Sequence, residues 1–131
     1  MADMTPKPRE GPTSPKGRAK AARKRERDTA RFEKQFHSEE RIAFVQSLPC
    51  VRCGQYFPPY GMNVHHDPTK ASGGTYKDTS PVCCDCHTLG GKARHNVGVE
   101  TFWRSVGMSY EASNAATEAA WLAHSGGGML R

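Results

Sequence analysis

The sequence predicts a small α+β domain flanked by helices and preceded by a basic tail. The first observation behind this fold class is a thin core, because the 131 residues are 36% hydrophobic and 8% aromatic, with 13 Gly and 9 Pro. The second is a central segment, residues 50–96, rich in Gly, Pro, Cys and His, with helical patterns on both sides of it. A small domain with so little core usually needs disulfides or a bound metal ion.

The excess positive charge lies in the N-terminal segment. Residues 1–31 hold ten Lys/Arg and four Asp/Glu, which accounts for the whole formal charge of +6. We expect residues 1–37 to be a largely disordered tail whose polar part becomes helical only on an acidic partner. Such tails usually contact nucleic-acid phosphates, a purely solubilising tail being the alternative. The candidate contacts are Arg18, Lys20, Arg23, Lys24 and Arg25.

Helix signals delimit the predicted domain, residues 38–125. Ser38 followed by two glutamates predicts an N-cap and a helix start, and Pro49 ends that helix. A short helix is expected around residues 100–106 and ends at Gly107. The Ala-rich stretch 109–125 predicts a further helix, and residues 126–131 a frayed C-terminus.

Two C-x2-C pairs, Cys50/Cys53 and Cys83/Cys86, predict a four-thiolate metal site. Each pair can present two sulfurs from a tight turn, and soft thiolates in tetrahedral geometry suit zinc. A redox C-x-x-C, buried free thiols and an iron–sulfur cluster are the alternatives. Cys84 is expected to be a small packed residue, because its use in place of Cys83 would leave a poorer C-x-C knuckle.

The compartment follows from what the sequence does not contain. No apolar run approaches the ~20 residues that span a bilayer, and the N-terminus lacks the apolar region of a signal peptide. We therefore expect a cytoplasmic protein with no membrane partner, in which clustered cysteines bind metal rather than form disulfides. An odd number of cysteines, five, agrees with this expectation.

Four histidines accompany the cysteine pairs: His65, His66, His87 and His95. Adjacent residues on an extended segment point to opposite faces, so one histidine of the His65–His66 pair can bind a metal while the other faces a substrate. A neutral imidazole can deprotonate water near pH 7, and a histidine-bound divalent ion can stabilise charge on a phosphate. Surface or core histidines are the alternative for each one alone.

The combined pattern "CVRCG…NVHHDP…SGGTYKDTSPVCCDCH" resembles the HNH endonucleases of the ββα-metal (His-Me finger) superfamily. The resemblance covers residues 48 to about 106 and is closest to small phage-borne nucleases of the recombination-enhancing type. It implies a ββα-metal motif on the four-cysteine zinc scaffold, phosphodiester hydrolysis in DNA, and a recombinase filament as a further partner. It also implies a catalytic divalent ion, Mg or Mn.

The resemblance also assigns roles to individual residues. His66 matches the general base that activates water, and His65 and His87 match two ligands of the divalent ion. The third ligand usually follows one helical turn after the second, where this chain has Gly91. His95 is therefore taken as a ligand displaced by an insertion. The motif asparagine is replaced by Asp78, which is expected to accept a hydrogen bond from His66, with Thr79 and Asn63 as alternatives.

The segment 69–78 is expected to join the two strands of the motif, with Gly73 and Gly74 at its turn. Basic side chains here and after the second cysteine pair are placed to reach phosphates, or else are ordinary solvated charges: Lys70, Lys77, Lys92 and Arg94. Trp103 is expected to pack in the core, with base stacking as the alternative.

Two other functions remain compatible with the sequence. One is a non-catalytic, zinc-dependent nucleic-acid-binding module, in which the histidines are vestigial or hold a second structural ion. The other is an adaptor whose basic tail binds an acidic protein surface. The sequence contains no recognition helix that would read bases, so the substrate structure and any sequence preference are open.

Overall fold

The computed structural model describes residues 14–127, and the chain divides into two compact units, residues 1–31 and residues 32–131. In the first unit, residues 15–31 belong to helix α1 (Pro15–Phe36), whose last residues, 32–36, are part of the second unit. Over residues 15–36 this differs from the disordered tail expected over residues 1–37. The helix has a physical basis, because Ala, Lys, Arg and Glu are good helix formers and Lys24 pairs with Asp28 four residues later. Residues 1–13 and 128–131 lie outside the described part.

The second unit contains a two-stranded antiparallel sheet. Strand β1 (Met62–His66) pairs with β2 (Thr79–Cys83), so that His66 lies opposite Thr79. The segment 69–78 lies in the loop that joins these two strands, as predicted, and it contains two short 3-10 turns, Lys70–Ser72 and Tyr76–Asp78. Gly73 is left-handed, with φ of 91°. A Cβ on Gly74 would lie 2.1 Å from the carbonyl oxygen of Pro68, so only glycine fits there.

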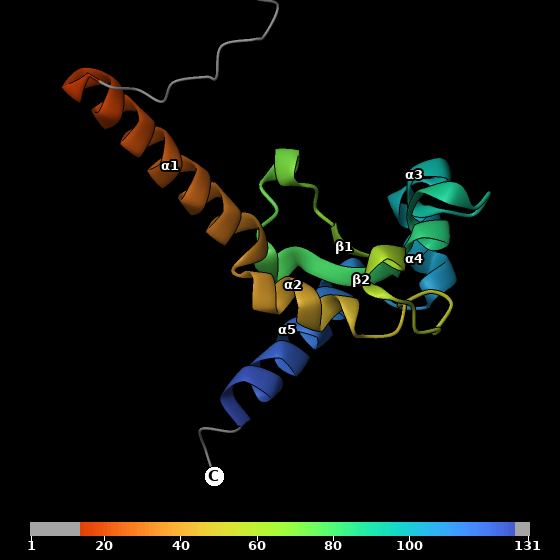
Figure 1. Cartoon of the computed structure of the whole chain (residues 1–131). Coiled ribbons are helices and arrows are strands. Elements are labelled where there is room, and N and C mark those ends of the chain that lie inside the picture. The colour runs from red at the N-terminus through yellow and green to blue at the C-terminus, as the bar shows by residue number, and fades with distance from the viewer. Residues whose placement is uncertain (1–13, 128–131) are drawn as a thin grey trace, which may run out of the picture. The chain divides into compact units, whose positions relative to one another are not determined.

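Helices from before and after the two strands contact this sheet (Figure 1). Helix α2 (Glu39–Gln46) contacts β1, and α5 (Tyr110–Gly127) contacts both β2 and α2. The elements after β2 are a π-helical turn (Asp85–Leu89), α3 (Arg94–Val97) and α4 (Val99–Val106). A further 3-10 turn, Pro59–Gly61, precedes β1.

The predicted helix boundaries are confirmed where a capping residue marks them. The side chain of Ser38 accepts a hydrogen bond from the backbone N–H of Arg41 at the start of α2. Gly107 is left-handed, with φ of 90°, and follows α4. The helix predicted over 109–125 is α5, whose bounds extend to Gly127 and therefore include two residues expected to be frayed.

The hydrophobic core is small and built around cysteines. Its buried members are Cys50, Met62, Val82, Cys83, Cys86, Phe102 and Trp103. Three of the predicted zinc ligands are therefore core residues, which explains how so few apolar side chains can hold the domain together. Trp103 is buried, as expected. Over residues 14–127, no helix combines the length and apolarity needed to cross a membrane.

A buried arginine ties three elements together. Arg41 of α2 is 1% exposed, and its guanidinium donates to the hydroxyl of Thr79 on β2 at 2.9 Å and to the carboxylate of Glu118 on α5 at 2.8 Å. It also lies over the ring of Tyr76, 5.2 Å from the centroid. These contacts fix α2 and α5 against the strand that faces His66.

Candidate metal centre and histidine cluster

The structure brings the four predicted cysteine ligands together. One sulfur from each of Cys50, Cys53, Cys83 and Cys86 lies within 4.8 Å of the others. The sulfurs of Cys53 and Cys83 are 3.9 Å apart. Sulfurs at about 2.3 Å from a tetrahedral zinc ion would be separated by about 3.8 Å, so the arrangement fits a zinc ion.

The surroundings of these sulfurs also fit a cation. Burial is the largest cause that raises the pKa of the Cys83 and Cys86 thiols, and repulsion from Cys50 adds to it. A bound zinc ion would remove this penalty, because it deprotonates coordinating thiols. Arg52 donates from Nη1 to the sulfur of Cys86 at 3.8 Å, an outer contact typical of thiolate sites.

Cys84 is not part of this cluster. It is half-buried, and its sulfur accepts a hydrogen bond from the amide of Asn63 at 3.5 Å. The expectation that Cys83 and Cys86, rather than Cys84, face the other pair is confirmed by this geometry. All five cysteines are free of disulfides.

A second cluster consists of His65, His87 and His95, each of which offers one nitrogen within 4.8 Å of the others. The Nε2 atoms of His87 and His95 are 3.0 Å apart. Two nitrogens at about 2.0–2.1 Å from a tetrahedral ion would be separated by about 3.3 Å. The three imidazoles thus lie at spacings suited to one divalent ion.

The backbone between His87 and His95 explains how these two side chains come to lie next to each other. The π-helical turn that carries His87 ends at Gly90, where a Cβ would lie 2.7 Å from the carbonyl oxygen of Asp85. The chain then reverses, and α3 begins at Arg94. The amide of Asn96 donates to the carbonyl oxygens of Thr88 and Gly90, which ties α3 to the end of that turn. His95 therefore joins the cluster without a continuous helix.

His66 has different partners from its neighbour. It is 7% exposed, and its Nε2–H donates to the main-chain carbonyl of Gln35 at 2.8 Å. The ring of Phe36 meets it edge-on, with centroids 5.4 Å apart. Burial is the largest cause that lowers the pKa of His66, and the charge of Lys70 lowers it further. The imidazole is therefore neutral near pH 7, with Nδ1 left to accept a proton.

The expected role of Asp78 is not what the structure shows. The carboxylate of Asp78 accepts hydrogen bonds from the backbone N–H and the hydroxyl of Thr75, at 2.9 and 3.3 Å, and closes a capping box. The group that accepts the hydrogen bond from His66 is the Gln35 carbonyl instead. Asp78 contributes at a distance, since its charge favours the protonated form of His66.

Asp67 is a site residue to which the sequence pattern assigned no role. Its buried carboxylate accepts hydrogen bonds from His65 at 2.7 Å, from Trp103 at 2.8 Å and from two nitrogens of Arg94 at 2.9 and 2.8 Å. Burial opposes ionisation, but these donors outweigh it and hold the pKa of Asp67 well below its usual range. The available signal was its place two residues after His65, because alternate residues of an extended segment share a face.

The predicted phosphate contacts have mixed outcomes. Arg94 forms a part-buried ion pair with Asp67, its side chain being 13% exposed, and its predicted contact with phosphate stays a prediction. Lys70 lies over the ring of Phe36 and Lys77 over that of Tyr76. Lys92 is exposed. In the first unit, Lys24 pairs with Asp28 at 2.9 Å.

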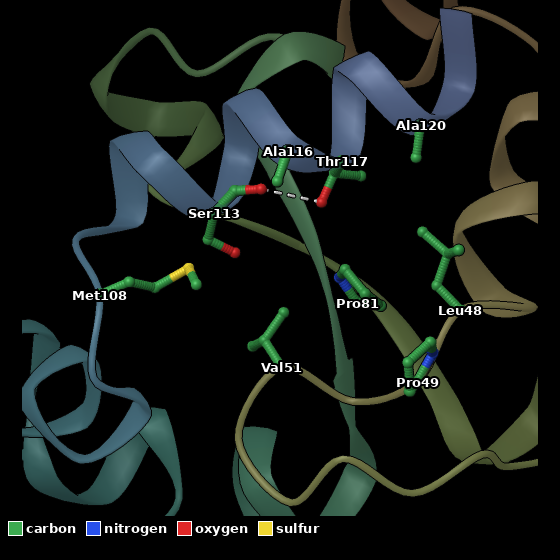
Figure 2. Close-up of a pocket in the computed structure, with 9 residues that line it drawn as sticks. All are labelled: Leu48, Pro49, Val51, Pro81, Met108, Ser113, Ala116, Thr117 and Ala120. Carbon is green, nitrogen blue, oxygen red and sulfur yellow. Dashed lines mark hydrogen bonds between the residues drawn. The ribbon is translucent and has the colours of Figure 1, made fainter. Parts of the chain in front are cut away.

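His66 and the three-histidine cluster line the same hollow, which has a volume of about 300 Å³. It is lined by Phe36, Val64, His65, His66, Thr69, Lys70, His87 and His95. A second hollow, of about 220 Å³, lies between α5 and the segment around Pro49 (Figure 2). Figure 2 shows Leu48, Val51 and Pro81 beside it, and its lining contains no titratable side chain. The histidine-lined hollow is therefore the candidate site for chemistry.

No family model, no curated protein and no solved structure matches this chain.

Proposed function

We propose that this protein is a metal-dependent DNA endonuclease of the HNH type. The observation that carries the proposal is the pairing, in one hollow, of three imidazoles spaced for a single ion with a fourth, separately held imidazole. Hydrolysis of a phosphodiester needs these two elements, a cation for the developing charge and a base for the attacking water. The proposal rests on this chemistry together with the motif resemblance.

In the proposed reaction, Nδ1 of His66 accepts a proton from the attacking water. The hydrogen bond to the Gln35 carbonyl holds the ring, and Phe36 limits its rotation. Lys70 lines the same hollow and offers a positive charge to the phosphate. A divalent ion bound by His65, His87 and His95 would stabilise the negative charge that develops on the phosphate oxygens.

The donor set bears on which ion would be used. Three neutral imidazoles suit Zn and neighbouring first-row ions, whereas Mg prefers carboxylate and water oxygens. The carboxylate of Asp67 contacts His65 of the cluster, but it also accepts hydrogen bonds from Arg94 and Trp103. We therefore rank Mn, Co, Ni and Zn ahead of Mg among the ions expected to support cleavage.

The proposed substrate is DNA, bound without sequence readout. Helix α1 carries no buried residue and is rich in Lys and Arg, which suits salt-dependent contact with phosphates. A recombinase filament as a partner stays a prediction from the motif resemblance alone.

The test is a plasmid-nicking assay with wild type and His66→Ala after chelation and re-addition of single divalent ions. His124→Ala is the matched control, because His124 is exposed on α5 and does not belong to the cluster. Ion-dependent nicking that is lost in His66→Ala and kept in His124→Ala is the expected result. Equal nicking by wild type and His66→Ala would rule out the mechanism.

The same assay addresses the other candidate function. If wild type binds zinc and shifts DNA but nicks it with none of the ions, a non-catalytic zinc-dependent binding module replaces the proposal. Repeating the assay on recombinase-coated DNA then separates such a module from a nuclease that requires a partner.

A further inference from the structure

We propose that Asp67 is the positioning residue of the histidine cluster, fixing the ring and the tautomer of His65 so that Nδ1 faces the cation. The inference deepens the proposed function, since it rests on the cation site, but it does not depend on the cleavage reaction. Asp67 directly follows the histidine pair in the chain, but the motif resemblance assigns it no role, so the assignment comes from contacts alone.

The first step is that Asp67 supplies only acceptors. Its Oδ2 atom lies 2.7 Å from Nε2 of His65, 2.9 Å from Nε of Arg94 and 2.8 Å from Nε1 of Trp103. Its Oδ1 atom accepts from Nη2 of Arg94 at 2.8 Å. An ionised carboxylate has no proton to give, so the shared hydrogen with His65 must reside on Nε2.

The second step concerns the other nitrogen of His65. A neutral imidazole carries one proton, and with Nε2 protonated, Nδ1 keeps its lone pair. Metal-bound histidines characteristically donate their second nitrogen to a carboxylate in this way, which fixes the ring and makes the ligand more basic. His65 is 4% exposed, so water does not compete for the bond.

The third step is that Asp67 itself is held at every polar group. Its backbone N–H donates to the carbonyl of Asp78 at 3.1 Å, and its carbonyl accepts from the amide of Asn114 at 2.6 Å. The amide oxygen of Asn114 accepts in turn from the hydroxyl of Ser80 at 2.7 Å. The carboxylate therefore cannot swing away, and it does not join the three imidazoles as a fourth ligand.

The test uses Asp67→Asn, which keeps the size of the side chain. It replaces one acceptor oxygen by an NH2 group, which would face the N–H donors of His65, Arg94 and Trp103. Cobalt is titrated into protein whose cysteine site already holds zinc, and binding is followed by the visible absorption of the ion. Asp85→Asn is the matched control for the charge change, because Asp85 is exposed on the turn that carries His87. Trp103→Phe removes one hydrogen-bond donor to Asp67 and leaves the contact between Asp67 and His65 in place. It therefore shows how much of any effect comes from a general loss of stability around Asp67.

We expect cobalt to bind Asp67→Asn about 10- to 100-fold more weakly than wild type. Asp85→Asn should match wild type, and Trp103→Phe should lower the melting temperature with little change in cobalt affinity. Equal cobalt affinity in Asp67→Asn and Asp85→Asn would overturn the proposal. So would parallel losses in Asp67→Asn and Trp103→Phe.

A second measurement keeps the proposal testable if Asp67→Asn does not fold. Nitrogen-15 correlation spectra of wild-type protein, without an ion at the histidines, report which nitrogen of His65 carries the proton. A single Nε2–H tautomer supports the role of Asp67, and an Nδ1–H tautomer overturns it. Neither measurement involves DNA cleavage. A protein that does not cleave DNA would therefore contradict the proposed function without deciding the role of Asp67.

Discussion

The main-chain carbonyl of Gln35 accepts a hydrogen bond from Nε2 of His66 at 2.8 Å. This contact joins the last turn of α1 to the end of strand β1, and the next residue, Phe36, packs edge-on against the same imidazole. A carbonyl can only accept, so the proton is on Nε2 and Nδ1 keeps a lone pair. The candidate general base is thus oriented by the main chain rather than by an acidic side chain.

The first prediction concerns the pH dependence of cleavage under the proposed function. Burial first, and then the Lys70 charge, lower the pKa of His66 from its usual 6.5, so the neutral base is retained at pH 7 and lost only on further acidification. The acidic midpoint of kcat/KM should therefore lie below 6.5 and should rise in Lys70→Met. Lys92→Met, an exposed lysine, is the control. A wild-type acidic midpoint above the usual histidine pKa would contradict this account.

The second prediction concerns stability at low pH. Burial, with repulsion from His65 and His95, lowers the pKa of His87 to about 4. Since the unfolded chain has the higher pKa, it takes up a proton first, and the folded state loses stability as the pH falls from about 6.5 to about 4. The loss from this group is at most about 3 kcal/mol. Thermal melts without an ion at the histidines should show this loss, and His87→Gln should flatten it. If His87→Gln left the pH profile of stability unchanged, protonation of His87 would not be its cause.

The third prediction separates the five cysteines. Cys86→Ala should lose bound zinc and the cooperative unfolding transition, because Cys86 is both a predicted ligand and a buried core residue. Cys84→Ala should keep the zinc of the cysteine site and unfold cooperatively. Metal content by mass spectrometry under native conditions, together with thermal melts, provides the measurement. Equal zinc loss in the two variants would mean that the ligand assignment is wrong.

The sequence was most informative where one residue type has few uses. Paired cysteines and histidines have few structural roles outside metal binding, so their spacing indicated both clusters, and the caps at Ser38 and Gly107 marked helix ends. The geometry of the three-histidine cluster depends on a turn from Gly90 to Ala93, closed by a 3.0 Å hydrogen bond, that spacing alone does not specify.

The hydrogen-bond partners of His66 and Asp67 could not be predicted from any local sequence pattern. Every residue has a main-chain carbonyl, so nothing in the sequence distinguished Gln35 as the partner of His66. Asp67 meets Arg94 and Trp103 only after folding, from 27 and 36 residues away. The sequence alone places Arg94 among the basic residues that could reach phosphate, because its partner Asp67 is distant in the chain. These contacts depend on tertiary packing rather than on local pattern.

The fourth prediction concerns the buried arginine. Arg41→Ala removes the donors to Thr79 and Glu118 and leaves the carboxylate without its partner. Breaking a buried pair from one side typically costs about 3–5 kcal/mol. We expect a loss near the lower figure, because the side chain of Glu118 is 17% exposed and water can partly replace the arginine. Chemical denaturation is the measurement, with Arg104→Ala, an exposed arginine on α4, as the control. A cost as small as that of the control would show that the pair is not stabilising.

The last prediction concerns DNA affinity and the basic residues of α1. Lys20→Gln and Lys24→Gln remove one charge each from the same helix, but Lys24 is already paired with Asp28 at 2.9 Å. A lysine that neutralises a phosphate releases a counterion, so its loss lowers the slope of log affinity against log salt by about 0.9. We expect this full change in Lys20→Gln and a smaller one in Lys24→Gln, because Asp28 offsets part of the Lys24 charge. Fluorescence anisotropy with a labelled duplex over a series of salt concentrations measures both slopes. Two slopes identical to wild type would remove α1 from the DNA-binding surface and leave the hollow around Lys70 to supply the affinity.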